Sequence, residues 1–359
     1  MSLSAAPQAA LAHFSVDTNP ASFYTFSLYR PLAQTEPEVG TMTQEQTIPV
    51  VDMRAFFDGT DAEREQFIQT LGDALVEFGF VAVEGHGVPQ DLLDEAYATY
   101  KAFFDMETSY KQRFEDASTG RQRGYTSFGV EHAKDSKKAD LKEFFHVGRE
   151  LATDHPDYTK MPPNLWPDQP SHLKDLSLRF YDAMEKNAMA MLHAISIYLG
   201  QDGDYLPNMA EGGSTIIRII HYPVCDGFDE PGVMRAAAHE DINLITILPP
   251  ATESGLELLS REGEWLPIHA IPGQMIMDSG DMLSRITNNK IPATTHRVVN
   301  PQGEPTARYS MPFFVHPHPD QVLTVLDSCV GEGEEAKYPP ITADDFLMER
   351  LREIGLAKK

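Results

Sequence analysis

The hydrophobic pattern divides the chain into a helical first half and a strand-rich second half. Apolar side chains recur every three or four positions in three long stretches, which is typical of amphipathic helices. The first helix is expected to begin at Thr60 or Asp61 and to end at Gly79. We predict a second helix from about Gln90 to Phe114 and the longest one from Ser171 to Gly200.

Beyond Thr215 the pattern changes to short β-branched runs separated by Gly, Pro and Asn. Such runs favour a β-sandwich or a small barrel. The runs 255–258 and 265–268 predict neighbouring strands of a meander. The segment 237–248 is apolar after Glu240, and we interpret it as one buried strand. A last amphipathic helix is predicted from Thr342 to Leu356.

The segment 237–248 contains the first candidate site. Side chains alternate between the two faces of a strand, so His239 and Asp241 are expected to point the same way and Glu240 the opposite way. An imidazole and a carboxylate side by side are two potential metal ligands. The alternative is a hydrogen-bonded pair that stabilises a buried strand.

A third ligand is available in a later β-branched run, 291–299, which contains His296. Two histidines and one carboxylate on one face of an octahedron leave open coordination positions. This arrangement suits non-haem Fe(II) oxygenases, which must hold a chelating cosubstrate and O2 on the metal together. His316 and His318 form a competing pair, but their prolines and loop context argue against it.

A polar pair on one strand face follows His296. Arg308 and Ser310 alternate with Tyr309, and the apolar run 311–315 comes next. A buried arginine needs an anionic partner, and its planar fork suits a carboxylate. A dicarboxylate cosubstrate would fill that role, with Ser310 as a further hydroxyl donor. The alternative is a structural ion pair with one of the many acidic residues.

His239-x-Asp241, His296 and Arg308-x-Ser310, in this order, resemble the 2-oxoglutarate/Fe(II)-dependent oxygenases of the isopenicillin N synthase-like superfamily. The resemblance runs from about Ile48 to about Val325. It implies a mainly β fold with flanking α-helices: a double-stranded β-helix, or jelly-roll, core with N-terminal helices and a long backing helix.

The resemblance also implies the chemistry. His239, Asp241 and His296 would bind Fe(II), and Arg308 and Ser310 would bind the far carboxylate of 2-oxoglutarate. A small organic substrate would be oxidised by O2, most simply by hydroxylation, with succinate and CO2 as coproducts.

Tyr222 would also approach the cosubstrate. In the family an Asn-x-Tyr-Pro pattern places a tyrosine hydroxyl there, and here Tyr222-Pro223 matches while Ile220 replaces the asparagine. Segments similar to residues 120–150 form one wall of the substrate pocket in the family. The charge run 134–142 within this region favours a solvated face or a mobile lid.

Composition limits the partners and the compartment. The 359 residues carry a formal net charge of −25, which argues against nucleic acid or an anionic membrane as a partner. Two cysteines, Cys225 and Cys329, fit a reducing cytosol, and we expect a cytoplasmic monomer. No apolar run approaches the roughly 18 residues of a membrane span.

The domain organisation is predicted to be simple. Residues 1–46 are rich in Ala, Ser, Thr and Pro and are expected to be a disordered extension, with Met42 as an alternative start. Residues 47–359 would form one oxygenase domain. Its parts would be an N-terminal α/β part (47–165), the long helix with the jelly-roll core (166–330) and a C-terminal helix (331–359).

Three hypotheses follow for the function. The leading one is a 2-oxoglutarate-dependent oxygenase that acts on a small molecule. The second is an oxidase like isopenicillin N synthase, which uses Fe(II) and O2 without 2-oxoglutarate and would bind a substrate carboxylate with Arg308 and Ser310. The third is a non-catalytic sandwich that binds a metal or a small ligand.

Overall fold

The computed structural model describes residues 47–132, 138–224, 233–269, 271–301, 304–354 and 356. Contacts between Cα atoms group residues Gln44–Lys359 in one compact unit. The predicted extension 1–46 and Cys225 lie outside the described residues.

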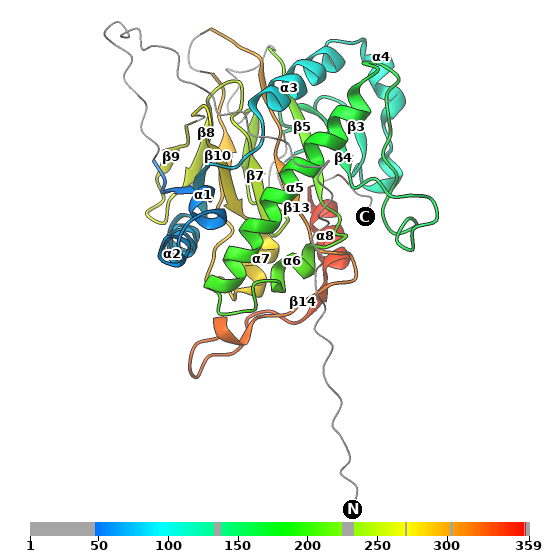
Figure 1. Cartoon of the computed structure of the whole chain (residues 1–359). Helices are drawn as coiled ribbons and strands as arrows, with labels where there is room; N and C mark the ends of the chain where they lie inside the picture. The colour runs from blue at the N-terminus through cyan, green and yellow to red at the C-terminus, as the bar shows by residue number, and fades with distance from the viewer. Residues whose placement is uncertain are drawn as a thin grey trace, which may run out of the picture. The chain divides into compact units, whose positions relative to one another are not determined.

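A large mixed sheet runs through the described part of the chain (Figure 1). Only β1 and β2 pair in parallel, and the other strand pairs are antiparallel. The strand order is β1 (Val50–Asp52), β2 (Phe80–Glu84), β10 (Met275–Ser279), β7 (Ile245–Leu248), β13 (Phe313–Val315), β5 (Ile216–Tyr222), β4 (Glu143–Gly148) and β3 (Gly124–Thr126), with β12 (Arg308–Ser310) also paired to β5.

A second, smaller sheet has the order β6 (Ala236–His239), β11 (His296–Val298), β8 (Leu256–Leu259) and β9 (Trp265–Pro267). The pairing of β8 with β9 confirms the predicted meander. In the second half the chain passes repeatedly from one sheet to the other, as in a jelly roll: β5, β7, β10, β12 and β13 lie in the large sheet and β6, β8, β9 and β11 in the small one. The predicted fold class is confirmed. The strands β14 (Val322–Leu323) and β15 (Ile341–Thr342) form a separate ribbon.

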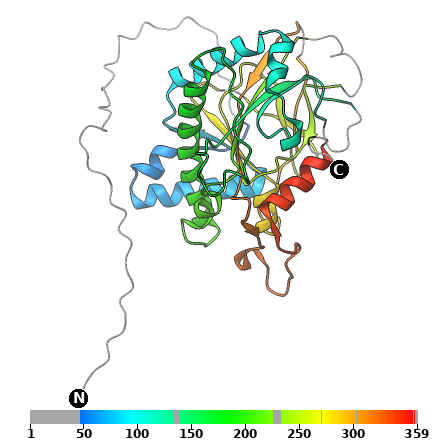
Figure 2. The same cartoon turned by 90° about the vertical axis from the view of Figure 1, so that its right-hand side faces the viewer.

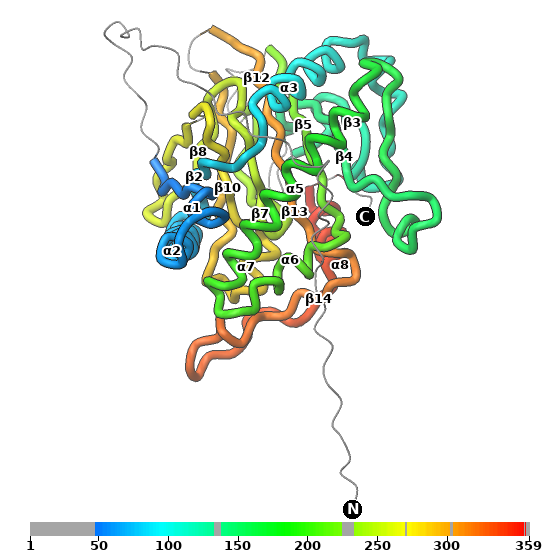
Figure 3. Tube along the Cα trace, in the orientation of Figure 1, coloured from blue at the N-terminus to red at the C-terminus, as the bar shows by residue number. Residues whose placement is uncertain are grey.

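Helices cover the large sheet, and the tube in Figure 3 follows them along the chain. The long helix α5 (Leu173–Tyr198) packs against α2 (Asp61–Phe78) and α3 (Gln90–Phe104) and contacts β7. The remaining α-helices are α1 (Met53–Phe57), α4 (Thr108–Lys111), α6 (Tyr205–Ala210), α7 (Asp281–Ile286) and α8 (Ala343–Glu353). Within the described ranges no helix combines the length and the apolarity that a bilayer crossing requires.

The start and the end of α2 are those that the sequence predicts. The side chain of Thr60 accepts from the backbone N–H of Glu63, and the Glu63 carboxylate accepts from the backbone N–H of Thr60. This capping box satisfies two N–H groups that the first turn leaves without a helical partner. Gly79 ends the helix at φ 66°, a conformation that side chains with a Cβ disfavour.

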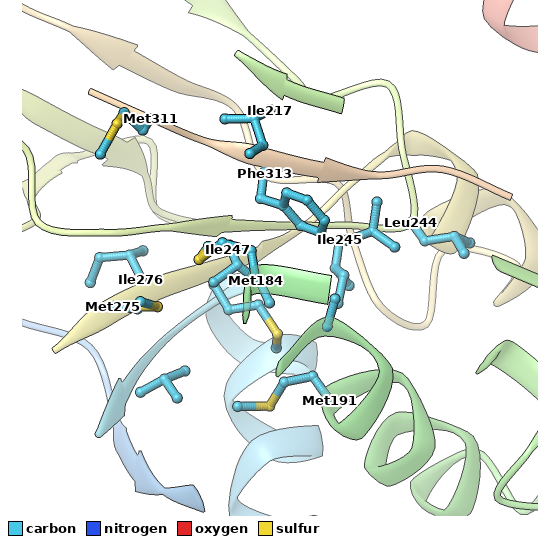
Figure 4. Close-up of a cluster of buried hydrophobic side chains, with 14 of the residues drawn as sticks. Met184, Met191, Ile217, Leu244, Ile245, Ile247, Met275, Ile276, Met311 and Phe313 are labelled. Atoms are coloured by element: carbon cyan, nitrogen blue, oxygen red, sulfur yellow. The ribbon is translucent and has the colours of Figure 1, made fainter. Parts of the chain in front are cut away.

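The core lies between α5 and the large sheet (Figure 4). Met184 and Met191 extend from α5 toward Ile245 and Ile247 of β7, and all four side chains are buried. The methionines of α5 therefore fill the core, as their helical spacing indicates. This packing fixes the strand that follows the candidate metal ligands.

Two predicted elements are each divided in the structure. The helix expected from Gln90 to Phe114 ends at Phe104, because Glu107 is extended (φ −52°, ψ 136°) and begins the separate short helix α4. The expected strand 237–248 consists of β6 and β7, which belong to different sheets. The chain crosses from one sheet to the other between them, so residues 240–244 are not in a strand.

Candidate metal centre and its two cavities

The candidate metal ligands meet on the small sheet. β6 and β11 are antiparallel neighbours, and their register places His239 directly opposite His296. The two ring centroids lie 4.4 Å apart. One ligand atom from each of His239, Asp241 and His296 lies within 4.8 Å of the others, and within the described ranges these are the residues that form such a group.

Asp241 reaches this position from a bend and not from a strand, so the predicted alternation along one strand is wrong for this residue. Its Oδ1 lies 3.9 Å from Nε2 of His239 and 3.8 Å from Nε2 of His296. Its Oδ2 accepts a hydrogen bond from the Thr246 hydroxyl, which in turn accepts from Nδ2 of Asn243 at 2.9 Å. These two side chains hold the carboxylate so that Oδ1 faces the imidazoles.

Hydrogen bonds to the backbone orient both imidazoles. Nδ1 of His239 is 2.7 Å from the carbonyl oxygen of Ala237, and Nδ1 of His296 is 3.2 Å from that of Thr294. Each Nδ1 therefore carries the proton, and each Nε2 presents a lone pair. The separations of 3.8 and 3.9 Å are too long for hydrogen bonds, whereas a cation bound at roughly 2 Å from each atom spans them. The donor set fits Fe(II).

Electrostatics keeps this group ready to bind a cation. Burial lowers the pKa of His239 to about 4, and the neighbouring His296 acts in the same direction. Burial acts to raise the pKa of Asp241, but the two histidines outweigh it and the net pKa is lowered. Burial and the Asp241 charge raise the pKa of Asp278 well above the ordinary carboxyl range. The site thus presents the neutral imidazole of His239 beside the Asp241 carboxylate.

Arg308 and Ser310 lie on one face of β12, as their spacing predicts. Nη1 of Arg308 donates to Oγ of Ser310 at 3.2 Å, and Nε donates to the carbonyl oxygen of Glu253 at 3.0 Å. Tyr309 points the other way and stacks on His221 at 4.5 Å between ring centroids. Arg308 is 2% exposed, and within the described ranges no carboxylate forms an ion pair with it.

Tyr222 completes this group, and its buried ring lies 5.1 Å from the guanidinium carbon of Arg308. A cavity of about 530 Å³ connects Arg308, Ser310 and Tyr222 with the candidate metal ligands His239 and Asp241. His296, Thr246 and Asp278 also line it. We call it the Arg308 cavity. The Arg308 cavity has a cation without a carboxylate partner at one end and the metal ligands at the other. It therefore suits an elongated anion that chelates a metal.

A second cavity, of about 620 Å³, opens on the other side of His239 and Asp241, and we call it the Glu131 cavity. Its polar lining includes Gln122, Glu131 and Asn243. Its apolar lining includes residues of α8, the red helix beside the C-terminus in Figure 2. Lys142, Arg218 and Phe314 line both cavities together with the two ligands.

The sequence reasoning missed the charged residues between the two cavities. The run 134–142 is predicted to be a solvated face or a mobile lid. Asp140 and Lys142 are buried, so the expectation of a solvated face is wrong for these two residues; residues 133–137 lie outside the described residues. Nζ of Lys142 lies 2.9 Å from Oδ2 of Asp140 and 3.1 Å from Oε1 of Glu131. The run of charges gives no hint of this burial, because distant segments contribute to it: Arg218 of β5 pairs with Glu131, and the backbone N–H of Ala237 in β6 donates to Asp140.

His316 and His318 do not join the metal ligands. Nδ1 of His316 is 3.1 Å from the carbonyl oxygen of Phe314, and Nε2 of His318 is 3.3 Å from Oδ2 of Asp157. Burial lowers the pKa of His316 to about 4. His316 is therefore a neutral wall of the Glu131 cavity.

A jelly roll with a His-Asp-His group beside a buried arginine and serine defines the class of non-haem iron oxygenases. Two family models match the chain: the N-terminal region of "non-haem dioxygenase in morphine synthesis" over residues 48–169 and the "2OG-Fe(II) oxygenase superfamily" over residues 213–317. A solved structure of a putative 2OG-Fe(II) oxygenase family protein from Caulobacter crescentus is 37% identical, with a TM-score of 0.77, and the match covers 86% of this chain and all of that one.

Two fungal relatives are similar over nearly the same span. A full-length protein from Neurospora crassa, solved in complex with alpha-KG, is 27% identical with a TM-score of 0.77 over 85% of this chain and 96% of its own. A 2-oxoglutarate-Fe(II) type oxidoreductase from Aspergillus fumigatus is 29% identical over 87% of this chain and 94% of its own.

The chain belongs to the 2OG-Fe(II) oxygenase superfamily. It is a 2-oxoglutarate-dependent dioxygenase that uses Fe(II), O2 and a small-molecule substrate. These findings confirm the leading hypothesis and favour it over an oxidase that works without 2-oxoglutarate.

Proposed function

We propose that His239, Asp241 and His296 bind Fe(II) and that Arg308, Ser310 and Tyr222 bind 2-oxoglutarate in the Arg308 cavity. The observation that carries this proposal is one cavity that joins the three ligands to a buried arginine without a described carboxylate partner. With the far carboxylate on Arg308 and Ser310, the other end of the oxo acid lies toward the metal. The guanidinium fork and the hydroxyl select a dicarboxylate.

The protein's own contribution is positioning and exclusion of water. With iron and 2-oxoglutarate held there, O2 would supply the oxidising equivalents, and oxidative decarboxylation of the oxo acid would give succinate and CO2. The chain holds a substrate C–H in the Glu131 cavity, beside His239 and Asp241. Both cavities are lined mainly by buried side chains, which keeps water from the reacting atoms. Hydroxylation is the outcome that this arrangement supports best.

The substrate is inferred to be a small organic molecule. The Neurospora crassa relative has also been solved with alpha-KG and thymine, and in that structure it is 26% identical to the chain. The Glu131 cavity combines apolar side chains with a few polar groups, which is the lining typical of sites for such ligands.

Two further proposals concern the organisation of the protein. We infer that residues 47–359 act as one oxygenase domain and that the protein is a monomer in the cytoplasm. Its exposed large apolar side chains, such as Phe57, Phe128 and Val322, come from distant parts of the chain, whereas a stable interface needs a contiguous patch. The low cysteine content supports a reducing compartment.

The experiment that tests the function is a turnover assay with Fe(II), ascorbate and 2-oxoglutarate. We expect succinate to form, and a substrate screen by mass spectrometry to find a product that has gained one oxygen atom. An Asp241→Ala variant should lose iron binding and succinate formation together. Succinate formation that continues unchanged in Asp241→Ala would contradict the assignment of the ligands.

A further inference from the structure

A buried charged cluster separates the metal ligands from the region 122–132, and the proposed reaction does not use it. Oε1 of Glu131 lies 3.1 Å from Nζ of Lys142 and 3.1 Å from Nη1 of Arg218. Oδ2 of Asp140 lies 2.9 Å from the same Nζ, and Oδ1 accepts from the backbone N–H of Ala237 at 3.0 Å. The cluster therefore contains two cations and two carboxylates, and its net charge is zero. Through Asp140 it is hydrogen-bonded to β6, the strand that carries His239.

Glu131 has a second oxygen that this cluster leaves unpaired. Glu131 is 8% exposed, and its Oε2 has no hydrogen-bond partner among the described residues. Arg218 and Lys142 hold the group as a carboxylate: burial acts to raise its pKa, but these two cations lower it to about 2. A buried carboxylate oxygen that accepts no hydrogen bond costs free energy. A ligand that donates a hydrogen bond to this oxygen would remove that cost. Glu131 lines the cavity that contains His239 and Asp241.

Arg218 lies beside this oxygen with donor capacity to spare. Its Nε donates to Nε2 of His146 at 2.7 Å, and its Nη1 donates to Glu131. Its Nη2 takes part in no hydrogen bond within the described ranges. The guanidinium carbon lies 4.6 Å from the ring of Phe144 and 5.2 Å from that of Phe314, which fixes its plane. An acceptor oxygen and donor N–H groups thus stand next to each other.

The other wall of the same cavity is apolar. Leu347, Leu351 and Ile354 from α8 and the residue that follows it line it, together with Ile216 and Ile242. A ligand that fits both walls has one polar edge and an apolar body. The cluster is neutral as a whole, and the charge of −25 on the chain disfavours an anionic ligand. A neutral ligand with one donor and one acceptor matches both Oε2 of Glu131 and the N–H groups of Arg218.

We propose that Glu131 and Arg218 read the polar edge of the substrate, and that this substrate is a neutral cyclic amide or imide. Its N–H would donate to Oε2 of Glu131 while its carbonyl oxygen accepts from Arg218. A ring holds N–H and C=O on the same edge, whereas an open-chain secondary amide is trans and points them in opposite directions. The inference rests on the proposed function and names the class of its substrate.

The test is a calorimetric binding experiment on the full chain loaded with Fe(II) and 2-oxoglutarate without oxygen. The probes are thymine, 2-pyridone and glutarimide, each beside its fully N-methylated counterpart, with N-methylacetamide as the trans amide. We expect at least one ring N–H compound to bind, and its methylated counterpart to bind at least about tenfold more weakly. The trans amide should not bind.

A matched pair of variants identifies the residue. Glu131→Gln should remove most of the preference for N–H over N–CH3, while Glu257→Gln should keep it, because Glu257 pairs with Arg297 and does not line the cavity. If Glu131→Gln does not fold, the affinities of the wild-type protein for each N–H compound and its methylated counterpart still test the inference. Equal affinity for the methylated probes, or no binding by any ring compound, would overturn the inference. Binding of 2-oxoglutarate is measured first, so its absence marks a failure of the proposed function instead.

Discussion

At the scale of single residues, the chemistry rests on polar atoms whose partners are incomplete. Arg308 is buried, and its described hydrogen bonds go to a carbonyl oxygen and a hydroxyl rather than to a carboxylate. Asp241 is the opposite case, because Thr246 satisfies one oxygen and leaves the other toward the imidazoles. Each residue therefore has a role that a substitution can isolate.

Arg308→Met should weaken 2-oxoglutarate binding by on the order of 100-fold and leave iron binding unchanged, because the far carboxylate loses a charge-assisted fork in a buried site. Calorimetric titration of 2-oxoglutarate into the iron-loaded protein measures the effect. Arg179→Met is the control, since Arg179 is exposed on α5 and pairs with Glu95. An unchanged affinity in Arg308→Met would place the oxo acid elsewhere.

Thr246→Val should lower iron affinity by about 10- to 100-fold, because the Asp241 carboxylate loses the hydroxyl that orients it. The measurement is competition for iron with a chelator, with unfolding followed in parallel. Thr70→Val, on the surface of α2, should change neither quantity. Should Thr246→Val retain the wild-type iron affinity, the hydroxyl has no part in orienting the ligand.

At the scale of elements, the site depends on a crossing between sheets. β6 brings His239 next to β11 in the small sheet, and β7 continues in the large sheet, where the core fixes it. The bend between them carries Asp241. The helix α8 then forms the apolar side of the Glu131 cavity.

Leu351→Ala tests the packing of α8. Leu351 is 3% exposed, and we expect the free energy of unfolding to fall by about 2–4 kcal/mol in urea titrations. Binding of 2-oxoglutarate should stay unchanged, because Leu351 does not line the Arg308 cavity. Val322→Ala, at an exposed position, serves as the control and should cost less than about 0.5 kcal/mol. A loss of 2-oxoglutarate affinity in Leu351→Ala would show that α8 supports both cavities.

At the scale of the whole molecule, buried histidines couple stability to pH. Burial and the Arg218 charge lower the pKa of His146 well below its ordinary value of 6.5, and burial lowers that of His316 to about 4. Below pH 6.5 the unfolded chain takes up protons that the folded chain does not bind. The contribution of these two histidines to the free energy of unfolding therefore falls as the pH falls below that value.

His146→Gln should flatten this dependence. One such histidine contributes a slope of about 1.4 kcal/mol per pH unit, and the variant loses that contribution. Denaturant titrations of the metal-free protein at several values from about pH 7 to about pH 5 measure it. A slope equal to that of the wild type would mean that His146 is not a source of the acid sensitivity.

The sequence by itself determined what local chemistry can specify. Helix α2 follows from a capping box and a terminal glycine, and β12 from the alternation of Arg308, Tyr309 and Ser310. The ligand residues could be named because their types and order suit one metal chemistry.

Only the tertiary structure decided which residues share a cavity. The division of the segment 237–248 between two sheets, and the burial of Glu131 beside Arg218, depend on residues far away in the sequence. A local pattern cannot reveal such partners. Burying a charge is costly unless an opposite charge lies next to it, so a charged residue is predicted to be exposed when its partner is not known. The edge proposed to recognise the substrate therefore became visible only in three dimensions.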